Sequence, residues 1–223
     1  MQNSCDEWTA EHKNRAATYA LLSRLLREEV SAESLRRLRK VREGADDSEA
    51  AGEGLILLDR YLSKTESHEE QNVLDELATD YAGLFLNAGD RPVHPYESVY
   101  SSPERLLMQR ARVEVRQIYA ASGLVLSGGN EPEDHIALEM EYMNHLCSRT
   151  VNASEKGDEE SVRAYLKSQR AFLENHLLRW ARQFSEDLMR FAATDFYRAL
   201  GCLIRDFLEL EKEFVAEWGG SLS

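Results

Sequence analysis

The sequence has few of the residues that interrupt or cross-link a chain. Only four of its 223 residues are proline, and its three cysteines, Cys5, Cys147 and Cys202, are widely separated and lack CxxC spacing. This usage excludes a disulfide framework and a zinc knuckle, and it indicates reduced thiols in a cytoplasm. The longest apolar runs, such as LILL at residues 55–58, are far too short to span a bilayer. We therefore expect a soluble cytoplasmic protein with no stable membrane insertion.

Basic charge is also scarce. Acidic residues outnumber lysine and arginine by 40 to 27, which gives a net charge of −13. A nucleic-acid-binding protein normally carries a basic stripe, and docking on anionic lipid needs basic segments. The first fifteen residues show no basic flank followed by an apolar stretch, so we expect no secretory signal. These features argue against nucleic acid and membrane as partners.

Motifs of enzyme chemistry are missing as well. The sequence contains no Walker A loop, no GxGxxG, no HExxH and no G-x-S-x-G elbow. The absence of every phosphate-cradling motif argues against an enzyme with a nucleotide cofactor, and we expect no cofactor.

Helical periodicity dominates the remaining sequence. Apolar residues recur at spacings of three and four, and no segment alternates with period two for long enough to predict a strand. We expect an all-α protein, a single bundle of about nine helices. Ser67-x-x-Glu70 predicts a capping box, and Ser102-Pro103 predicts an N-cap followed by proline at the first helical position. The helices are expected near residues 7–28, 32–42, 52–64, 68–86, 103–121, 132–155, 158–178, 180–191 and 195–217.

One glycine-rich connection divides this bundle. Residues 122–131 read SGLVLSGGNE and are the best candidate for a hinge. We expect one domain over residues 1–223, with an N-terminal lobe at 1–121 and a C-terminal lobe at 132–223. A mobile hinge there would permit a domain-swapped homodimer.

The prolines are confined to two connections, Asn87–Tyr100 (NAGDRPVHPYESVY) with the residues just after it, and Asn130–His135 (NEPEDH). A helical protein that concentrates its rigid residues in this way has shaped those connections for function. Tyr96 and Tyr100, beside Pro95, offer a rigid and partly apolar surface that suits a peptide groove.

Acidic charge concentrates after the second connection. Residues 130–160 hold nine acids and two bases, which is most often a solvated face but also suits a collar for a basic partner. On a helix beginning at Pro132, Asp134, Glu141 and His145 would share one face and could ligate a metal. No second Glu-x-x-His helix completes such a site, so we expect no metal and keep a metal-dependent enzyme as an alternative.

Three residues of this helix are unusual. Glu139 falls inside its apolar arc, where a carboxylate is costly unless it is paired, so we expect it to bind the backbone of a neighbouring loop. Asp134 at the helix start suits the dipole and can cap free N–H groups. His135 is less favourable there, which hints at a specific contact.

These residues, in this order, resemble the TorD/DmsD family, the cytoplasmic maturation chaperones of molybdenum-containing oxidoreductases exported by the twin-arginine route. The resemblance covers roughly residues 74–185. The motifs that carry it are Tyr81-x-x-Leu84-Phe85, Pro95-Tyr96-Glu97-Ser98-Val99-Tyr100, Glu131-Pro132-Glu133-Asp134-His135, Glu139 with Tyr142-Met143, and Phe172 with His176-Leu177 and Trp180.

The resemblance implies an all-helical chaperone without catalytic activity. Such a protein binds the twin-arginine signal peptide of the apo-molybdoenzyme catalytic subunit, prevents premature export and assists insertion of the molybdopterin cofactor. The implied peptide-binding residues are Pro95, Tyr96, Pro132, Asp134 and His135, where some relatives have tryptophan in place of Tyr96. The residues expected to hold the loop in place are Glu97, Ser98, Tyr100 and Glu139.

Residues and resemblance together suggest a mechanism. The arginines of the leader would pair with carboxylates near Asp134 and in the acidic run, and its apolar stretch would lie against Pro95, Tyr96 and the hinge. Two further alternatives stay open. One is a nitrate-reductase-type chaperone that acts on the body of the apo-enzyme, and the other is a plain helical interaction module.

Overall fold

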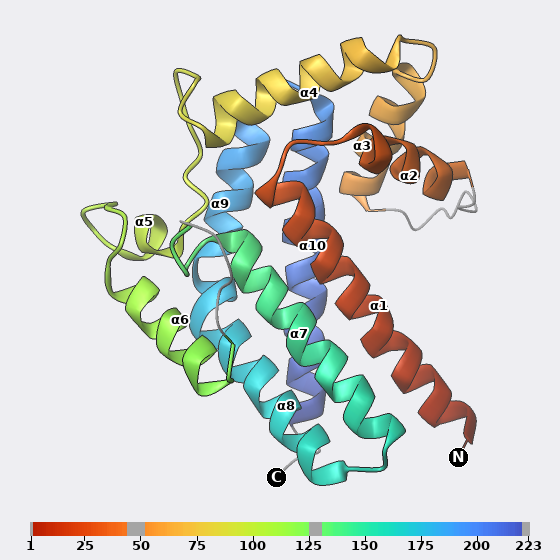
Figure 1. Ribbon diagram of the computed structural model, residues 1–223, viewed down its shortest axis with the longest axis vertical. Coiled ribbons are helices and arrows are strands. Elements are labelled where there is room, and N and C mark those ends of the chain that lie inside the picture. Colours follow the sequence, from red (N-terminus) through yellow and green to blue (C-terminus); the bar gives the residue numbers. More distant parts are fainter. Residues whose placement is uncertain (1, 44–51, 125–130, 220–223) are drawn as a thin grey trace. The chain divides into compact units, whose positions relative to one another are not determined.

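The computed structural model describes residues 2–43, 52–124 and 131–219, and every regular element in these ranges is a helix (Figure 1). The all-α prediction is therefore confirmed. No helix in these ranges is long and apolar enough to cross a membrane. The helices are α1 (Gln2–Arg27), α2 (Ala32–Glu43), α3 (Glu53–Lys64), α4 (Glu70–Phe85), α5 (Glu97–Ser101), α6 (Arg110–Ala121), α7 (Ile136–Glu155), α8 (Glu159–Phe172), a π-helical turn (Leu173–Leu177), α9 (Leu178–Phe191) and α10 (Asp195–Gly219).

The chain divides into two compact units, each built from segments that are distant in the sequence. The first unit consists of Met1–Arg27, Tyr96–Trp180 and Leu210–Ser223, and the second of Glu28–Pro95 and Ala181–Glu209. This division differs from the two consecutive lobes expected from the sequence, because the first and last segments of the chain belong to the same unit. Residues 125–130 of the expected hinge lie outside the described residues.

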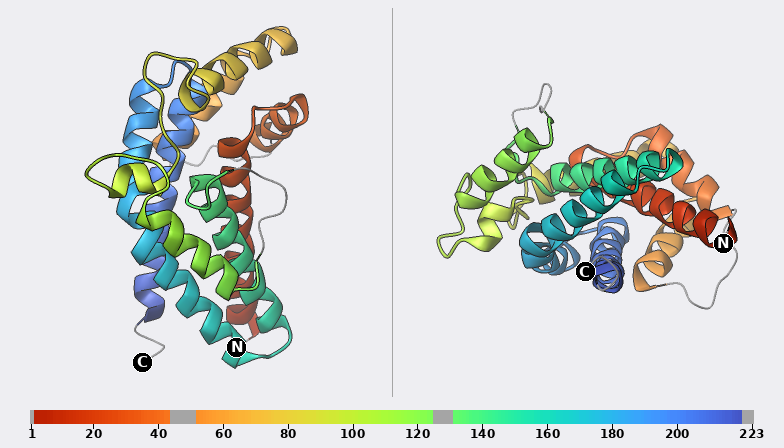
Figure 2. Two further views of the ribbon diagram at one scale, coloured as in Figure 1. Left: turned by 60° about the vertical axis from the view of Figure 1, so that its left-hand side comes forward. Right: turned by 90° about the horizontal axis from the view of Figure 1, so that it is seen from below.

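The core of the first unit forms around α7. Helix α1 runs alongside α7, and α8 returns along it after the turn at Gly157 (Figures 1 and 2). Helix α7 is buried over most of its N-terminal half, because neighbouring helices cover more than one of its faces. Ser23 on α1 donates a 2.8 Å hydrogen bond to the carbonyl of Ala137, which fixes the two helices against each other.

A buried ion pair ties α1 to the last segment of the first unit. The Arg15 side chain donates to both carboxylate oxygens of Glu211 on α10, each at 2.6 Å. The hydroxyl of Tyr19 donates to the same carboxylate at 2.8 Å. Both charged side chains are nearly inaccessible to solvent, so each charge is balanced by the other charge and not by water.

The second unit packs α3 and α4 with residues of α9 and α10. The carboxylate of Asp80 on α4 accepts hydrogen bonds from the backbone N–H groups of Ala193 (3.0 Å) and Thr194 (2.8 Å), at the start of α10. Gly54 lets α3 approach α10 closely, since a Cβ there would lie 2.8 Å from the backbone nitrogen of Leu203.

Four expected helix limits differ from the structure. The helix expected from residue 103 begins at Arg110, and the short α5 precedes it; Arg105 and Met108 between them adopt positive φ. Helix α4 begins at Glu70 without a side-chain cap, so the capping box is absent. The helix expected from residue 132 begins at Ile136, and the expected break near residue 179 is a π-helical turn that continues into α9.

Candidate functional site

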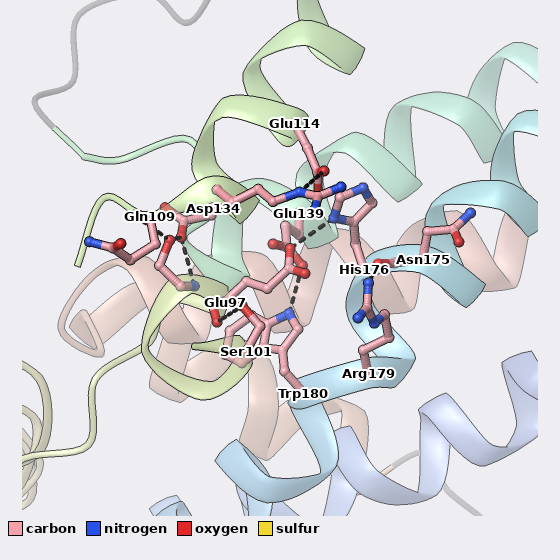
Figure 3. Close-up of polar contacts among 12 residues, drawn as sticks. Glu97, Ser101, Gln109, Glu114, Asp134, Glu139, Asn175, His176, Arg179 and Trp180 are labelled. Carbon is pink, nitrogen blue, oxygen red and sulfur yellow. Dashed lines mark hydrogen bonds and ion pairs between the residues drawn. The ribbon is translucent and has the colours of Figure 1, made fainter. Parts of the chain in front are cut away.

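The two proline-bearing connections meet at Asp134. Its Oδ2 accepts hydrogen bonds from the backbone N–H of Ser98 (2.9 Å) and from the Ser98 hydroxyl (2.5 Å). The Asp134 carbonyl accepts from the N–H of Glu97 at 2.9 Å, and Tyr96 and His135 form an isolated antiparallel bridge. Asp134 thus anchors the N-terminus of α5, as Figure 3 shows. The Ser98 hydroxyl also accepts from the N–H of Gln109, which fixes the start of α6.

Asp134 is fully buried at this junction. Burial raises the pKa of its carboxyl above the ordinary value, although the hydrogen bonds from Ser98 act in the opposite direction. Its second oxygen, Oδ1, has no hydrogen-bond partner among the described residues. A peptide would reach this carboxylate only after the junction opened.

His135, rather than Asp134, caps α7. The N–H of Ala137 donates to Nδ1 of His135 at 3.1 Å, so this ring nitrogen must be unprotonated. Burial lowers the pKa of His135 to about 4. The specific contact suggested by the sequence exists, because the ring lies edge-on to Tyr96 with centroids 5.1 Å apart.

Tyr96 and Glu131 are accessible at the surface of this junction. Tyr96 is partly buried and donates a 2.8 Å hydrogen bond from its hydroxyl to Oε2 of Glu131, which is exposed. Pro132 is buried, and so is Pro95, the last residue of the second unit. Of the five predicted peptide-binding residues, Tyr96 alone is more than slightly accessible.

A buried polar cluster lies on the other side of α5 (Figure 3). Nδ1 of His176 is 2.8 Å from Oε2 of Glu97, and the indole N–H of Trp180 donates to Oε2 of Glu139 at 3.2 Å. The Tyr100 ring stacks on Trp180 with centroids 5.5 Å apart. Burial, followed by the charge of neighbouring Glu97, raises the pKa of Glu139 well above its ordinary value and favours its protonated form.

The roles within the loop differ in one respect from those expected. Asp134, and not Glu139, accepts hydrogen bonds from the backbone of the loop, while Glu139 contacts Trp180. His176 and Trp180 were noted in the sequence without a role in the site. Their four-residue spacing, which places two side chains on the same face of a helix, was the available signal.

The acidic run is largely committed to contacts within the protein. Asp134 and Glu139 are buried, and Asp158 caps α8 through the N–H of Ser161. Four more acids form ion pairs: Glu133 with Arg112, Glu141 with Arg27, Glu155 with Lys13 and Glu159 with Arg163. Within the described ranges, Glu131 and Glu160 are the two exposed acids of the run that neither form an ion pair nor cap a helix.

The alternative metal site loses its geometric basis. Asp134 precedes the first residue of α7, so it does not share a helical face with Glu141 and His145. Glu141 is paired with Arg27 at 2.9 Å. Among the residues that the structure describes, no group of three or more His, Cys, Asp or Glu side chains could hold a metal ion.

Comparisons with known proteins agree with this architecture. The family model described as nitrate reductase delta subunit matches residues 45–186. Proteins named chaperone protein TorD from Vibrio cholerae and Aliivibrio fischeri are each 27% identical to this chain. The alignments cover 92% and 95% of it, and 94% and 99% of the relatives. A crystal structure of a proposed redox enzyme maturation protein from Archaeoglobus fulgidus shares the fold, with a TM-score of 0.52 at 17% identity over 87% of this chain and 93% of that one. The resemblance to the TorD/DmsD chaperones is thus confirmed, and the chain belongs to the nitrate reductase delta subunit family.

Proposed function

We propose that this protein is a cytoplasmic chaperone for the maturation of a molybdopterin-dependent oxidoreductase. It binds the twin-arginine signal peptide and the apo form of the catalytic subunit, prevents premature export and assists cofactor insertion, without catalysing a reaction itself. The relatives named chaperone protein TorD, which align over nearly the whole chain, support this proposal.

The observation that carries the proposal is the rigid junction of the two proline-bearing connections. Hydrogen bonds from Ser98 and Glu97 to Asp134 hold the connections together and leave Tyr96 at the surface. Because this surface is already ordered before binding, no conformational entropy is lost in ordering it. This preorganisation favours the binding of an extended peptide. In this arrangement Tyr96 contacts the leader, while the buried residues Pro132, Asp134 and His135 of the same unit support the surface around it.

An exposed apolar segment follows α5 in the same unit. Leu106, Leu107 and Met108 are 56%, 44% and 57% exposed, and the hydrogen bond from Gln109 to Ser98 fixes the end of this segment to the junction. Consecutive exposed apolar residues commonly mark interaction surfaces. We assign the apolar stretch of the leader to this segment.

A second candidate function is a chaperone that acts on the body of the apo-enzyme without a cleavable leader. The description of the matching family, nitrate reductase delta subunit, favours it. This alternative shares the fold and the junction but needs no site for arginine.

The test is isothermal titration of the full-length protein with synthetic twin-arginine leaders from several molybdoenzymes, each beside its twin-lysine counterpart. We expect saturable binding that weakens with added salt and with the lysine peptides, because part of the affinity is electrostatic and arginine binds carboxylates through two parallel hydrogen bonds. Binding to fragments of the mature enzyme, but to no leader, would favour the second candidate. Binding to neither would contradict both.

A further inference from the structure

We propose that Glu131, oriented by Tyr96, is the carboxylate that accepts a guanidinium group of the bound peptide; this inference rests on the proposed function. It makes Glu131 a specificity-determining residue, with a peptide arginine as its ligand. From the sequence alone, the expected partners of the leader arginines are carboxylates near Asp134 and the acidic run as a whole.

Burial excludes two acids of the run, Asp134 and Glu139, from this role. Asp134 is fully buried and uses one oxygen for Ser98, and Glu139 is fully buried next to Trp180. A peptide arginine that reached either carboxylate would lose its hydration and displace contacts that stabilise the junction. The desolvation cost of a buried ion pair commonly exceeds what the pair returns.

Existing ion pairs exclude most of the remaining acids. Glu133 is bound to Arg112, and the acids farther along α7 and α8 are paired or cap a helix. Glu160 is exposed, but it lies in the first turn of α8, at the opposite end of α7 from the junction. Glu131 is therefore the acid of the run that is both accessible and adjacent to Tyr96.

The geometry around Glu131 suits a guanidinium. A carboxylate offers about four acceptor positions, and the hydrogen bond from Tyr96 to Oε2 occupies one of them. The following residue is Pro132, which restricts the backbone of Glu131 to extended conformations. The Tyr96 ring is itself held edge-on by His135. A fixed aromatic ring can stack on the planar face of an arginine guanidinium while the neighbouring carboxylate accepts hydrogen bonds from its N–H groups. A lysine ammonium has no such plane and offers only a point charge.

The test compares two matched variants that each remove one exposed negative charge, Glu131→Gln and the control Glu160→Gln. Each is titrated with a twin-arginine leader and with the twin-lysine peptide, after circular dichroism and thermal unfolding confirm the fold. For Glu131→Gln we expect affinity for the twin-arginine leader to fall about tenfold or more, as for loss of a charge-assisted hydrogen bond. Affinity for the lysine peptide should change much less, so the preference for arginine shrinks. Glu160→Gln should bind both peptides like the wild type.

A third variant examines the orientation of the carboxylate. Tyr96→Phe removes the hydroxyl and keeps the ring, so it should lower affinity for the arginine peptide by a smaller factor, and combining it with Glu131→Gln should add little. Non-additivity of this kind is the signature of residues that act together.

The outcomes separate this inference from the proposed function. If the wild type binds the leader and Glu131→Gln binds it equally well, the inference is overturned and the proposed function stands. Equal losses in Glu131→Gln and Glu160→Gln, or an unchanged preference for arginine, would also overturn it, since they indicate unspecific charge attraction. If the wild type binds no leader, both the proposed function and the inference fail.

Discussion

Arg15 and Glu211 form a buried, two-pronged ion pair, although 196 positions separate them in the sequence. The two hydrogen bonds are 2.6 Å long, and the side chains are 6% and 2% exposed. Nδ1 of His12 lies 3.0 Å from the guanidinium and accepts from it, since arginine can only donate. Burial and the charge of Arg15 lower the pKa of His12 to about 3, which keeps that nitrogen free to accept.

The burial of this ion pair predicts that it contributes far more to stability than the exposed ion pair that Lys13 forms on the same helix, α1. Glu211→Gln should lower the free energy of unfolding by about 3–5 kcal/mol, because it leaves the Arg15 charge buried without its counter-charge. Glu155→Gln is the control, since Glu155 pairs with Lys13 on α1 and both side chains are more than half exposed. It should cost less than about 1 kcal/mol. Urea unfolding followed by circular dichroism measures both changes, and equal losses would contradict this account.

The raised pKa of Glu139 predicts that the stability of the folded protein depends on pH. Its pKa is raised above the ordinary value of 4.5, so above that pH the unfolded chain releases a proton that the folded protein keeps. Stability should therefore fall as pH rises from about 4.5 to the native pKa of Glu139, by at most about 1.4 kcal/mol per pH unit. Glu139→Gln does not titrate and retains an acceptor for Trp180, so its advantage over the wild type should grow with pH. Urea midpoints between pH 5 and pH 8 measure this, with Glu160→Gln as an exposed control. Parallel curves for wild type and Glu139→Gln would show that Glu139 ionises normally.

The lowered pKa of His135 predicts a stability that rises with pH, over a lower pH range. Its folded pKa of about 4 lies below the ordinary 6.5, so its contribution is complete above pH 6.5 and is lost as pH falls toward 4. His135→Ala should cost about 1 kcal/mol at pH 8 through loss of the cap on α7. His135→Asn should recover most of that loss, because asparagine caps helices well and does not titrate. Thermal unfolding at pH 8 and pH 5 tests this, and an alanine variant as stable as the asparagine variant would refute the capping role.

Two glycines of the second unit should respond in opposite ways to alanine. At Gly54 a Cβ would lie 2.8 Å from both the backbone nitrogen and the Cγ of Leu203, so Gly54→Ala should destabilise by about 1–3 kcal/mol. At Gly83 in α4 the nearest atom to a Cβ would be 3.9 Å away. Gly83→Ala should be neutral or stabilise by up to about 1 kcal/mol, because alanine favours helix. Chemical denaturation of the two variants measures these changes in the free energy of unfolding. Equal changes would show that α3 and α10 can move apart without cost to accommodate the Cβ of alanine.

Much of the helical architecture could be predicted from the sequence because it depends on periodicity. The long helices α7 and α10 show the repeat over many turns, and the position of Glu139 in the apolar arc correctly indicated its burial. The five residues of α5 complete little more than one turn, so periodicity could not reveal them. Pro103 satisfied a local rule for a helix start, but the hydrogen bond from Gln109 to Ser98 places that start at Arg110.

The candidate site was predictable in its location but not in its contacts. Clustered prolines identified the two connections, and the structure joins them through Asp134 and Ser98. Which acids stay accessible depended on partners elsewhere in the chain, such as Arg27 for Glu141 and Lys13 for Glu155. Such partners lie more than a hundred positions away, and no local pattern indicates them.

The ion pair between Arg15 and Glu211 has a consequence for biosynthesis. Helix α1 leaves the ribosome early, but its partner on α10 is translated nearly two hundred residues later. Until then the side chain of Arg15 has no Glu211 to neutralise it, and the first unit lacks one of its three segments. The second unit is likewise interrupted, so neither unit can be completed while the ribosome is still in the first half of the message. Each unit therefore acquires its full set of contacts only when its last segment has been translated, unlike the units of chains with consecutive domains.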